Sequence, residues 1–387
     1  MPKLASIDEL AERAHKAAGV DSFNSQTFRE GFDILLRDIA AQNVTPSGVT
    51  AVESNIVEFL KTRLRIEQYA RENPEILSAE IKKPIFVMGI PRTGTTLLSN
   101  LLAVDPAHRS LLTWEASDPV PPPEAGMTHT DSRALKALAA EAEMKKANPS
   151  AGRFYRSSAI YPTECIFVHA HEGKALYWES FGRVPNYSSY MINADMTAAY
   201  EYERLFLQVL QHKAKGVWNL KMPSHALYLR YLLKVFPDAR VIWTHRDPYT
   251  AAGSLCSLIG NSHMRLLPEA DREWIGQNYP KQMRTHIDRA MEVRAELGAD
   301  RIFDSHYADI MRDPMGQMKA IYQFLGDPLS PEADSAMRSW LDDNPQGKFG
   351  AHEYKLAEYG LSVEKLRPFF ADYIDRFKIE SEGKGQA

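Results

Sequence analysis

The chain has 387 residues, of which 44% are hydrophobic and 25% are charged, a composition typical of a globular protein with one large domain or two smaller ones. A net charge of −4 gives no overall attraction to nucleic acid or to an acidic membrane, so a polyanionic ligand would have to be bound by local groups of charge. Two cysteines are too few for a disulfide framework or a four-thiolate zinc site. Because neither the N-terminus nor any other segment is long and apolar, we expect a cytoplasmic protein without a transmembrane segment.

Residues 1–80 are predicted to form a helical N-terminal extension. Apolar residues recur at helical spacing between Phe28 and Ile39 and again between Val52 and Leu64. Residues 43–46 separate these two helices, and Asn73-Pro74 ends the second one. Such a region is suited to packing, to a lid or to a dimer surface, and it leaves the oligomeric state open.

From residue 84 onward, strand patterns alternate with helix patterns. The apolar run at 84–90 (PIFVMGI) predicts a strand buried on both faces, followed by a helix that begins near Thr95. Further strands are expected at 217–221, 240–245 and 301–305, with helices at 224–235, 249–259 and 313–325. This alternation predicts an α/β fold, a P-loop-like parallel sheet flanked by helices, with ligands at the carboxyl ends of its strands.

The α/β domain is expected to span 81–387 and to contain an insertion at about 116–215. The insertion includes a helix at about 131–147 and an aromatic-rich segment at 154–190, which suits a substrate pocket or plain core packing. His169 and His171 within it would place two imidazoles on one face of a possible strand, too few by themselves for zinc. The charged tail from Glu380 onward is predicted to be disordered.

Residues 89–96 (GIPRTGTT) have the spacing of a phosphate-binding loop between a strand and a helix. Backbone N–H groups at such a helix start favour an anion. Thr95 stands where a nucleoside triphosphatase has its lysine, and Arg92 offers a different cation, so the loop suits an anion other than ATP with magnesium. The alternative is an ordinary glycine-containing turn.

A second candidate anion site lies in residues 245–254 (HRDPYTAAGS). Arg246 is expected at the end of a strand, and Ser254 follows eight residues later inside a helix, so both side chains can reach one phosphate. Considered alone, Arg246 could equally pair with a nearby carboxylate such as Asp247.

Residues 91–98 (PRTGTTLL) resemble the 5′-phosphosulfate loop of sulfotransferases that use 3′-phosphoadenosine-5′-phosphosulfate (PAPS), especially the branch with bacterial enzymes and tyrosylprotein sulfotransferases. Residues 245–254 are similar to the 3′-phosphate site of the same family, and the family-like layout extends from about 82 to 377. The resemblance implies that Arg246, Ser254 and, in a basic loop at 347–352, Lys348 bind the 3′-phosphate. It implies that the 5′-phosphosulfate is held by Arg92, Thr93, Gly94, Thr95 and Thr96.

The resemblance also suggests how the chemistry is divided. Lys221, at the end of the strand VWNLK, resembles the family's catalytic lysine, which contacts the oxygen that bridges sulfate and phosphate, and Arg92 would assist it. The base stays open between Glu115, which matches the glutamate of the tyrosylprotein branch, and His225, which departs from the spacing of the cytosolic branch.

We therefore expect a sulfotransferase that moves a sulfuryl group from PAPS to a hydroxyl of a small organic acceptor and releases adenosine 3′,5′-bisphosphate. No metal is expected, because a sulfate ester carries less charge than a phosphate. The alternatives are a P-loop kinase that uses ATP and a non-catalytic nucleotide-binding protein. Nothing in the sequence identifies the acceptor.

Overall fold

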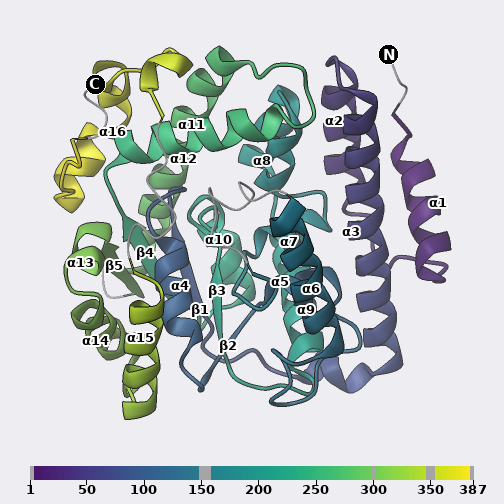
Figure 1. Ribbon diagram of the computed structural model, residues 1–387, viewed down its shortest axis with the longest axis horizontal. Helices are drawn as coiled ribbons and strands as arrows, with labels where there is room; N and C mark the ends of the chain where they lie inside the picture. Colours follow the sequence, from purple (N-terminus) through teal and green to yellow (C-terminus); the bar gives the residue numbers. More distant parts are fainter. Residues whose placement is uncertain (1–3, 148–157, 299–300, 346–353, 384–387) are drawn as a thin grey trace.

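The computed structural model describes residues 4–147, 158–298, 301–345 and 354–383. Its centre is a five-stranded sheet with the order β2-β3-β1-β4-β5, in which all neighbouring strands are parallel (Figure 1). The strands are β1 (Ile85–Gly89), β2 (His108–Ser110), β3 (Val217–Lys221), β4 (Arg240–His245) and β5 (Ile302–His306). The predicted α/β fold is confirmed, and β2 is the strand that the apolar pattern did not indicate, because three residues are too few to show a periodicity.

Helices cover both faces of the sheet because successive residues of its buried strands point to opposite sides. Ile85 and Val87 pack in a hydrophobic cluster with residues of α4, α14 and α15, whereas Met88 packs on the other face with residues of α10, α11, α12 and α16. The bounds are α4 (Thr95–Ala103), α10 (His225–Val235), α11 (Pro248–His263), α12 (Arg272–Leu297), α13 (Tyr307–Arg312), α14 (Pro314–Leu325), α15 (Pro331–Asp343) and α16 (Val363–Phe377).

The N-terminal residues form α1 (Ile7–Ala18), α2 (Arg29–Ala40), α3 (Pro46–Glu72) and a short 3-10 helix, η1 (Pro74–Ser78). In Figure 1 they stand along one side of the molecule. Their apolar faces belong to the same hydrophobic cluster as residues of α7 to α10 and Leu220 of β3. Buried Arg63 of α3 also pairs with Glu67 and with Glu172, so an ion-pair network ties α3 to the segment after α7.

The segment between β2 and β3 is helical, with α5 (Thr113–Ser117), α6 (Ser132–Ala147), α7 (Ile166–Ala170), η2 (Leu176–Phe181), α8 (Pro185–Asn193) and α9 (Thr197–Gln211). The possible strand around His169 and His171 was wrong, since His169 lies in α7 and His171 directly after it. Their rings contact different residues of α9: His169 Nε2 lies 2.7 Å from Glu203 Oε2, and His171 Nδ1 lies 2.7 Å from the Tyr202 hydroxyl. The two imidazoles therefore do not converge on one point.

The predicted disorder after Glu380 was wrong for residues 380–383, which the structure places against the end of β4. Lys378, at the end of α16, has a left-handed φ of 51°, and the chain turns there. Ile379 is buried in the same cluster as α16, and the Glu382 backbone N–H donates to Asp247 Oδ2 at 2.9 Å. In the described part of the chain, no helix is long and apolar enough to span a membrane.

Candidate active site

A cleft of about 680 Å³ opens at the carboxyl ends of the strands, where ligands bind in open parallel sheets. One part of its wall is polar and comes from the loop after β1, from Ser224 after β3, from Arg246 after β4 and from Tyr307 after β5. The other part comes from the insertion and from α11 and is mostly apolar, with Ile166, Leu176, Tyr177, Leu255, Leu258 and Ile259. The cleft thus joins a charged region to an apolar one.

The loop after β1 has the shape that its sequence predicts. Gly94 has φ of 91°, and a Cβ atom there would lie 2.7 Å from the Tyr307 ring, so both backbone conformation and space require glycine. Helix α4 begins at Thr95 directly afterwards, and no side chain of the described residues caps its first turn. The N–H groups of that turn are therefore open to an anion in the cleft, which Gly94, Thr95 and Thr96 line.

Arg92 connects the two predicted phosphate signatures. Its backbone has φ of 74°, a left-handed conformation that is unusual for arginine and is common at functional sites. Its Nε donates to Ser254 Oγ at 3.0 Å, and its carbonyl oxygen accepts from Arg246 Nη1 at 3.0 Å. Two segments more than 150 residues apart in sequence, each with a candidate anion site, therefore lie side by side.

The Thr93 side chain faces away from the cleft. Its hydroxyl donates to the Ile90 carbonyl oxygen at 2.8 Å and lies 2.6 Å from Thr244 Oγ1 on β4. Thr93 is buried and can offer only its backbone to a ligand, whereas Thr95 and Thr96 line the cleft. Its side chain fastens the loop to the neighbouring strand.

Lys221 ends β3 and does not itself line the cleft, but its ammonium group contacts two residues that do, Thr96 and Glu164. Its Nζ donates to Glu164 Oε1 at 2.7 Å and lies 3.4 Å from Thr96 Oγ1. The lysine side chain is fully buried, while the Glu164 side chain is 19% exposed and lines the cleft. An acid and a cation thus meet beside the start of α4.

Glu164 is the residue that the sequence interpretation missed. It lies in the long insertion, in no motif, and is held beside β3, where the Cys165 backbone N–H donates to the Lys221 carbonyl oxygen at 3.0 Å. The only available signal was an acidic residue directly before an apolar segment, which is common on protein surfaces.

Arg246 lies across the cleft from the insertion, with its guanidinium carbon 4.2 Å from the centre of the Tyr307 ring. Its ion-pair partner is Glu382 of the C-terminal segment, at 2.5 Å between Nε and Oε1. The predicted alternative, a pair with Asp247, is not what the structure shows, because Asp247 caps α11 by accepting from the Tyr249 N–H at 2.9 Å.

Glu115 lies in the interior, away from the residues that line the cleft. Its Oε2 accepts from Arg109 Nη1 at 2.9 Å and from the Leu112 N–H at 3.0 Å, and Arg109 Nη2 contacts its other oxygen. The side chain is fully buried. This placement argues against the predicted role as base, since a base must reach the acceptor hydroxyl.

His225 also faces the core, although its neighbour Ser224 lines the cleft. Its Nδ1 lies 2.8 Å from the Tyr200 hydroxyl, and burial, followed by the nearby His169, holds its pKa well below the usual range. One of its ring nitrogens, the Cys165 sulfur and a Glu203 oxygen all lie within 4.8 Å of one another. His225 therefore belongs to a buried polar cluster behind Lys221 and is neutral.

The predicted contribution of Lys348 lies outside the described residues. The described chain on either side contacts the site region: Pro345 lines the cleft, and the Tyr354 hydroxyl donates to the Thr250 carbonyl oxygen at 2.7 Å.

Comparison with known proteins agrees with this geometry. Residues 84–331 match the family model described as the sulfotransferase family. The structure is similar to that of sulfotransferase STF9 from Mycobacterium avium, with a TM-score of 0.94, 39% identity and coverage of 99% of both chains. It also resembles STF1 from Mycobacterium tuberculosis, with a TM-score of 0.85 and 30% identity over 96% of this chain and 100% of the other.

A curated relative is omega-hydroxy-beta-dihydromenaquinone-9 sulfotransferase Stf3 from Mycobacterium bovis, which is 28% identical over 313 residues, or 76% of this chain and 74% of the relative. The chain belongs to the sulfotransferase family. It is an enzyme that transfers a sulfuryl group to a hydroxyl of a small acceptor, which decides against the kinase and the non-catalytic protein.

Proposed function

We propose that the sulfuryl donor is PAPS and that its nucleotide lies in the charged part of the cleft. The observation that carries this proposal is the contact of Arg92 with Ser254 and of Arg246 with the Arg92 carbonyl, which unites two anion-binding segments. PAPS has two anionic ends on one nucleoside, so it fits paired sites better than a ligand with a single phosphate chain does.

The 5′-phosphosulfate is assigned to the start of α4, where the N–H groups of the first turn and the helix dipole favour negative charge. Arg92, Thr95 and Thr96 would add their side chains. The 3′-phosphate is assigned to Arg246 and Ser254, because a guanidinium group binds phosphate through two parallel hydrogen bonds.

For the transfer itself, we assign the base to Glu164 and the stabilisation of the leaving group to Lys221. The acceptor oxygen attacks the sulfur while the bond from sulfur to the 5′-phosphate oxygen breaks, and that oxygen keeps the electron pair. Lys221 would stabilise the resulting charge, which is largest in the transition state. Glu164, 2.7 Å from Lys221 and exposed to the cleft, would take the proton of the acceptor hydroxyl.

The apolar part of the cleft supports an acceptor that is a lipophilic alcohol or phenol. Its walls are largely aliphatic, with few polar groups such as Ser180, Ser262 and Gln282 to orient the ligand. The relative Stf3 acts, as its name states, on a hydroxylated menaquinone. Both cysteines are free and buried, which fits a reducing compartment such as the cytoplasm.

The donor proposal is tested by calorimetric titration with adenosine 3′,5′-bisphosphate in the presence of EDTA. We expect binding without metal, and Arg246→Ala should weaken it by roughly 30-fold, the loss of a charge-assisted contact. Adenosine 5′-phosphate should be affected far less, and Arg230→Ala, an exposed arginine paired with Glu296, is the control. Equal weakening of both nucleotides, or binding of ATP with Mg²⁺ instead, would contradict the proposal.

A further inference from the structure

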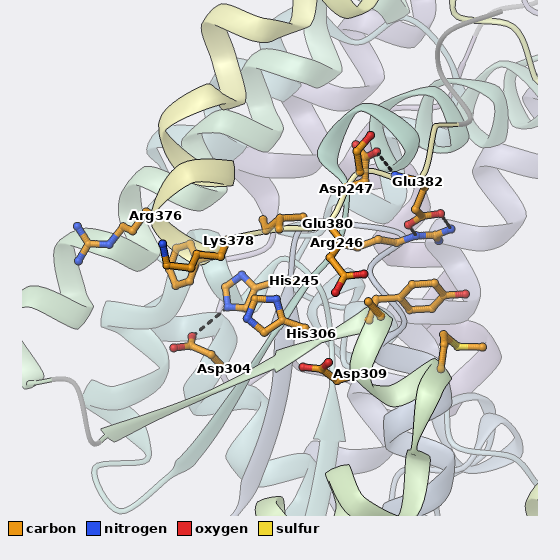
Figure 2. Close-up of a pocket in the computed structure, with 16 residues that line it drawn as sticks. His245, Arg246, Asp247, Asp304, His306, Asp309, Arg376, Lys378, Glu380 and Glu382 are labelled. Carbon is orange, nitrogen blue, oxygen red and sulfur yellow. Dashed lines mark hydrogen bonds and ion pairs between the residues drawn. The ribbon is translucent and has the colours of Figure 1, made fainter.

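The guanidinium group of Arg246 is already bound by a carboxylate of the same chain. Arg246 Nε lies 2.5 Å from Glu382 Oε1, and Arg246 Nη2 donates to Glu382 Oε2 at 2.7 Å (Figure 2). This parallel, two-bond geometry is the one in which arginine also binds a phosphate. Both side chains are about one-fifth exposed, so the pair is partly shielded from water.

The segment that carries Glu382 is held in this position by other contacts. The Glu382 backbone N–H donates to Asp247 Oδ2 at 2.9 Å, and Asp247 itself caps α11. Two residues earlier, Glu380 pairs with exposed Arg312 at 3.0 Å, and the Ile379 N–H donates to the Ile374 carbonyl oxygen at 3.1 Å. These contacts thus fix the backbone of the segment so that the Glu382 carboxylate lies against Arg246.

Arg246 keeps its orientation through contacts that do not involve Glu382. Its Nη1 donates to the Arg92 carbonyl oxygen at 3.0 Å, and its guanidinium group lies over the Tyr307 ring. Only the edge formed by Nε and Nη2 is used by Glu382. That edge can therefore exchange one anion for another while the arginine stays in place.

We propose that Glu382 is an intramolecular competitor for the 3′-phosphate: it binds Arg246 in the free enzyme and is displaced when PAPS or adenosine 3′,5′-bisphosphate binds. This proposal rests on the assignment of Arg246 to the 3′-phosphate. A phosphate carries more charge and more acceptor oxygens than a carboxylate, so it can displace Glu382, whereas a nucleotide without it cannot. Glu382 would thereby lower the affinity for donor and product alike and speed product release.

The structure has room for the displaced side chain. A cavity of about 710 Å³ lies beside the segment, lined by residues of β4, β5 and the end of α16, and Figure 2 shows Glu382 at its edge.

The test is the affinity of Glu382→Gln for adenosine 3′,5′-bisphosphate, with Glu296→Gln, an exposed glutamate paired with Arg230, as the control that should leave this affinity unchanged. Glutamine keeps the size and removes the charge. We expect Glu382→Gln to bind the bisphosphate about tenfold more tightly and to release it more slowly in stopped-flow measurements. Adenosine 5′-phosphate should bind both variants as it binds the unmodified protein, and a chain that ends at Ile379 should behave like Glu382→Gln.

Unchanged or weaker bisphosphate binding by Glu382→Gln would overturn the competitor role. Arg246→Ala separates this outcome from a failure of the proposed function. If Arg246→Ala weakens the bisphosphate while Glu382→Gln does not tighten it, only the competitor is wrong. If Arg246→Ala leaves bisphosphate affinity unaltered, the 3′-phosphate assignment itself is wrong, and the competitor proposal is wrong with it.

Discussion

Two glutamates of this enzyme lie in contrasting environments that suit different roles. Glu164 pairs with Lys221 and remains partly exposed to the cleft, so a ligand can reach its carboxylate. Glu115 is fully buried against Arg109 and a backbone N–H, an arrangement that stabilises the fold. Because only Glu164 lines the cleft, we propose Glu164 and not Glu115 as the base.

Substitution of each glutamate by glutamine distinguishes these roles. Glu164→Gln should lower the turnover of an alcohol by roughly 10²- to 10⁴-fold, the usual contribution of a general base, with a smaller loss for an acidic phenol. Its melting temperature should also fall, because the buried ammonium group of Lys221 loses its charged partner, so turnover is compared at a temperature at which the variant stays folded. Glu115→Gln should destabilise the protein by about 3 kcal/mol, because Arg109 is left as a buried charge without a charged partner, while the folded variant keeps its turnover. Steady-state kinetics and thermal unfolding of both variants provide the measurement.

The opposite pattern would restore the assignment that the sequence suggested. That pattern is a stable Glu115→Gln variant with little turnover, together with a Glu164→Gln variant of near-normal activity. His225→Asn is a further control, since a neutral imidazole facing the core should affect stability more than the rate.

The short helix η2 places a buried carboxyl group, that of Glu179, in the wall of the cleft. Glu179 is buried, both of its oxygens accept from Gln282 Nε2 at 2.9 and 3.0 Å, and it borders the apolar part of the cleft. Burial raises its pKa from 4.5 to about 7. The folded protein therefore binds this proton more tightly than the unfolded chain does.

This pKa predicts how stability depends on pH. Because the folded pKa lies above the unfolded value, the stabilisation is complete below about pH 4.5 and is lost as the pH rises through about 7. The loss amounts to about 3 kcal/mol at 1.36 kcal/mol for each pKa unit. In urea unfolding, the free energy of unfolding should fall between pH 5 and pH 8 much less for Glu179→Gln than for the unmodified protein.

Buried histidines change the stability in the opposite direction as the pH rises, but their effect cancels when the unmodified protein is compared with Glu179→Gln. Burial lowers the pKa of His286 to about 4, so this residue adds stability as the pH rises from about 4 to 6.5. His286 is present in both proteins and cancels in the difference. If the stability of Glu179→Gln depends on pH as strongly as that of the unmodified protein, then Glu179 is ionised in the folded protein at neutral pH.

Elements with a strong local pattern could be predicted, and those without one could not. The apolar strands around residues 85–89 and 240–245 and their following helices agree with the sequence pattern, because burial on both faces demands continuous apolar runs. Helix α7 was mistaken for a strand because five residues cannot distinguish the two periods. The segment 380–383 was mistaken for disorder because its charges suggest solvent, while its contacts are tertiary.

The contrast between local sequence patterns and tertiary contacts applies to the candidate site as well. Arg92, Gly94 and Arg246 could be found from sequence because each lies in a turn fixed by its own strand and helix. Glu164, Tyr307 and Glu382 contact these residues through the packing of distant segments, which no local spacing records. The aromatic-rich segment at 154–190, for which pocket and core were both open, contributes Tyr177 to the cleft, whereas Trp178 and Tyr187 are core residues.

At the scale of the whole molecule, the strand order explains how one cleft is assembled. β1 lies between β3 and β4, so the phosphate loop after β1 is flanked by Lys221 on one side and by Arg246 on the other. The insertion after β2 adds Glu164 and the apolar wall, and the C-terminal segment brings Glu382 to Arg246. The proposed donor site, the proposed catalytic pair and the apolar wall therefore meet at one edge of the sheet.

Sulfuryl transfer from PAPS at this cleft can be measured with ³⁵S-labelled PAPS and a panel of lipophilic alcohols and phenols in the presence of EDTA. We expect label to pass to an acceptor with equal formation of adenosine 3′,5′-bisphosphate, and we expect Lys221→Met to lower the rate by a factor of at least about 100 while bisphosphate affinity changes little. Lys234→Met, an exposed lysine of α10, should transfer normally. Full transfer by Lys221→Met would contradict the proposed role of this lysine. Phosphorylation of the same acceptors from ATP with Mg²⁺, without sulfuryl transfer from PAPS, would contradict the proposed donor.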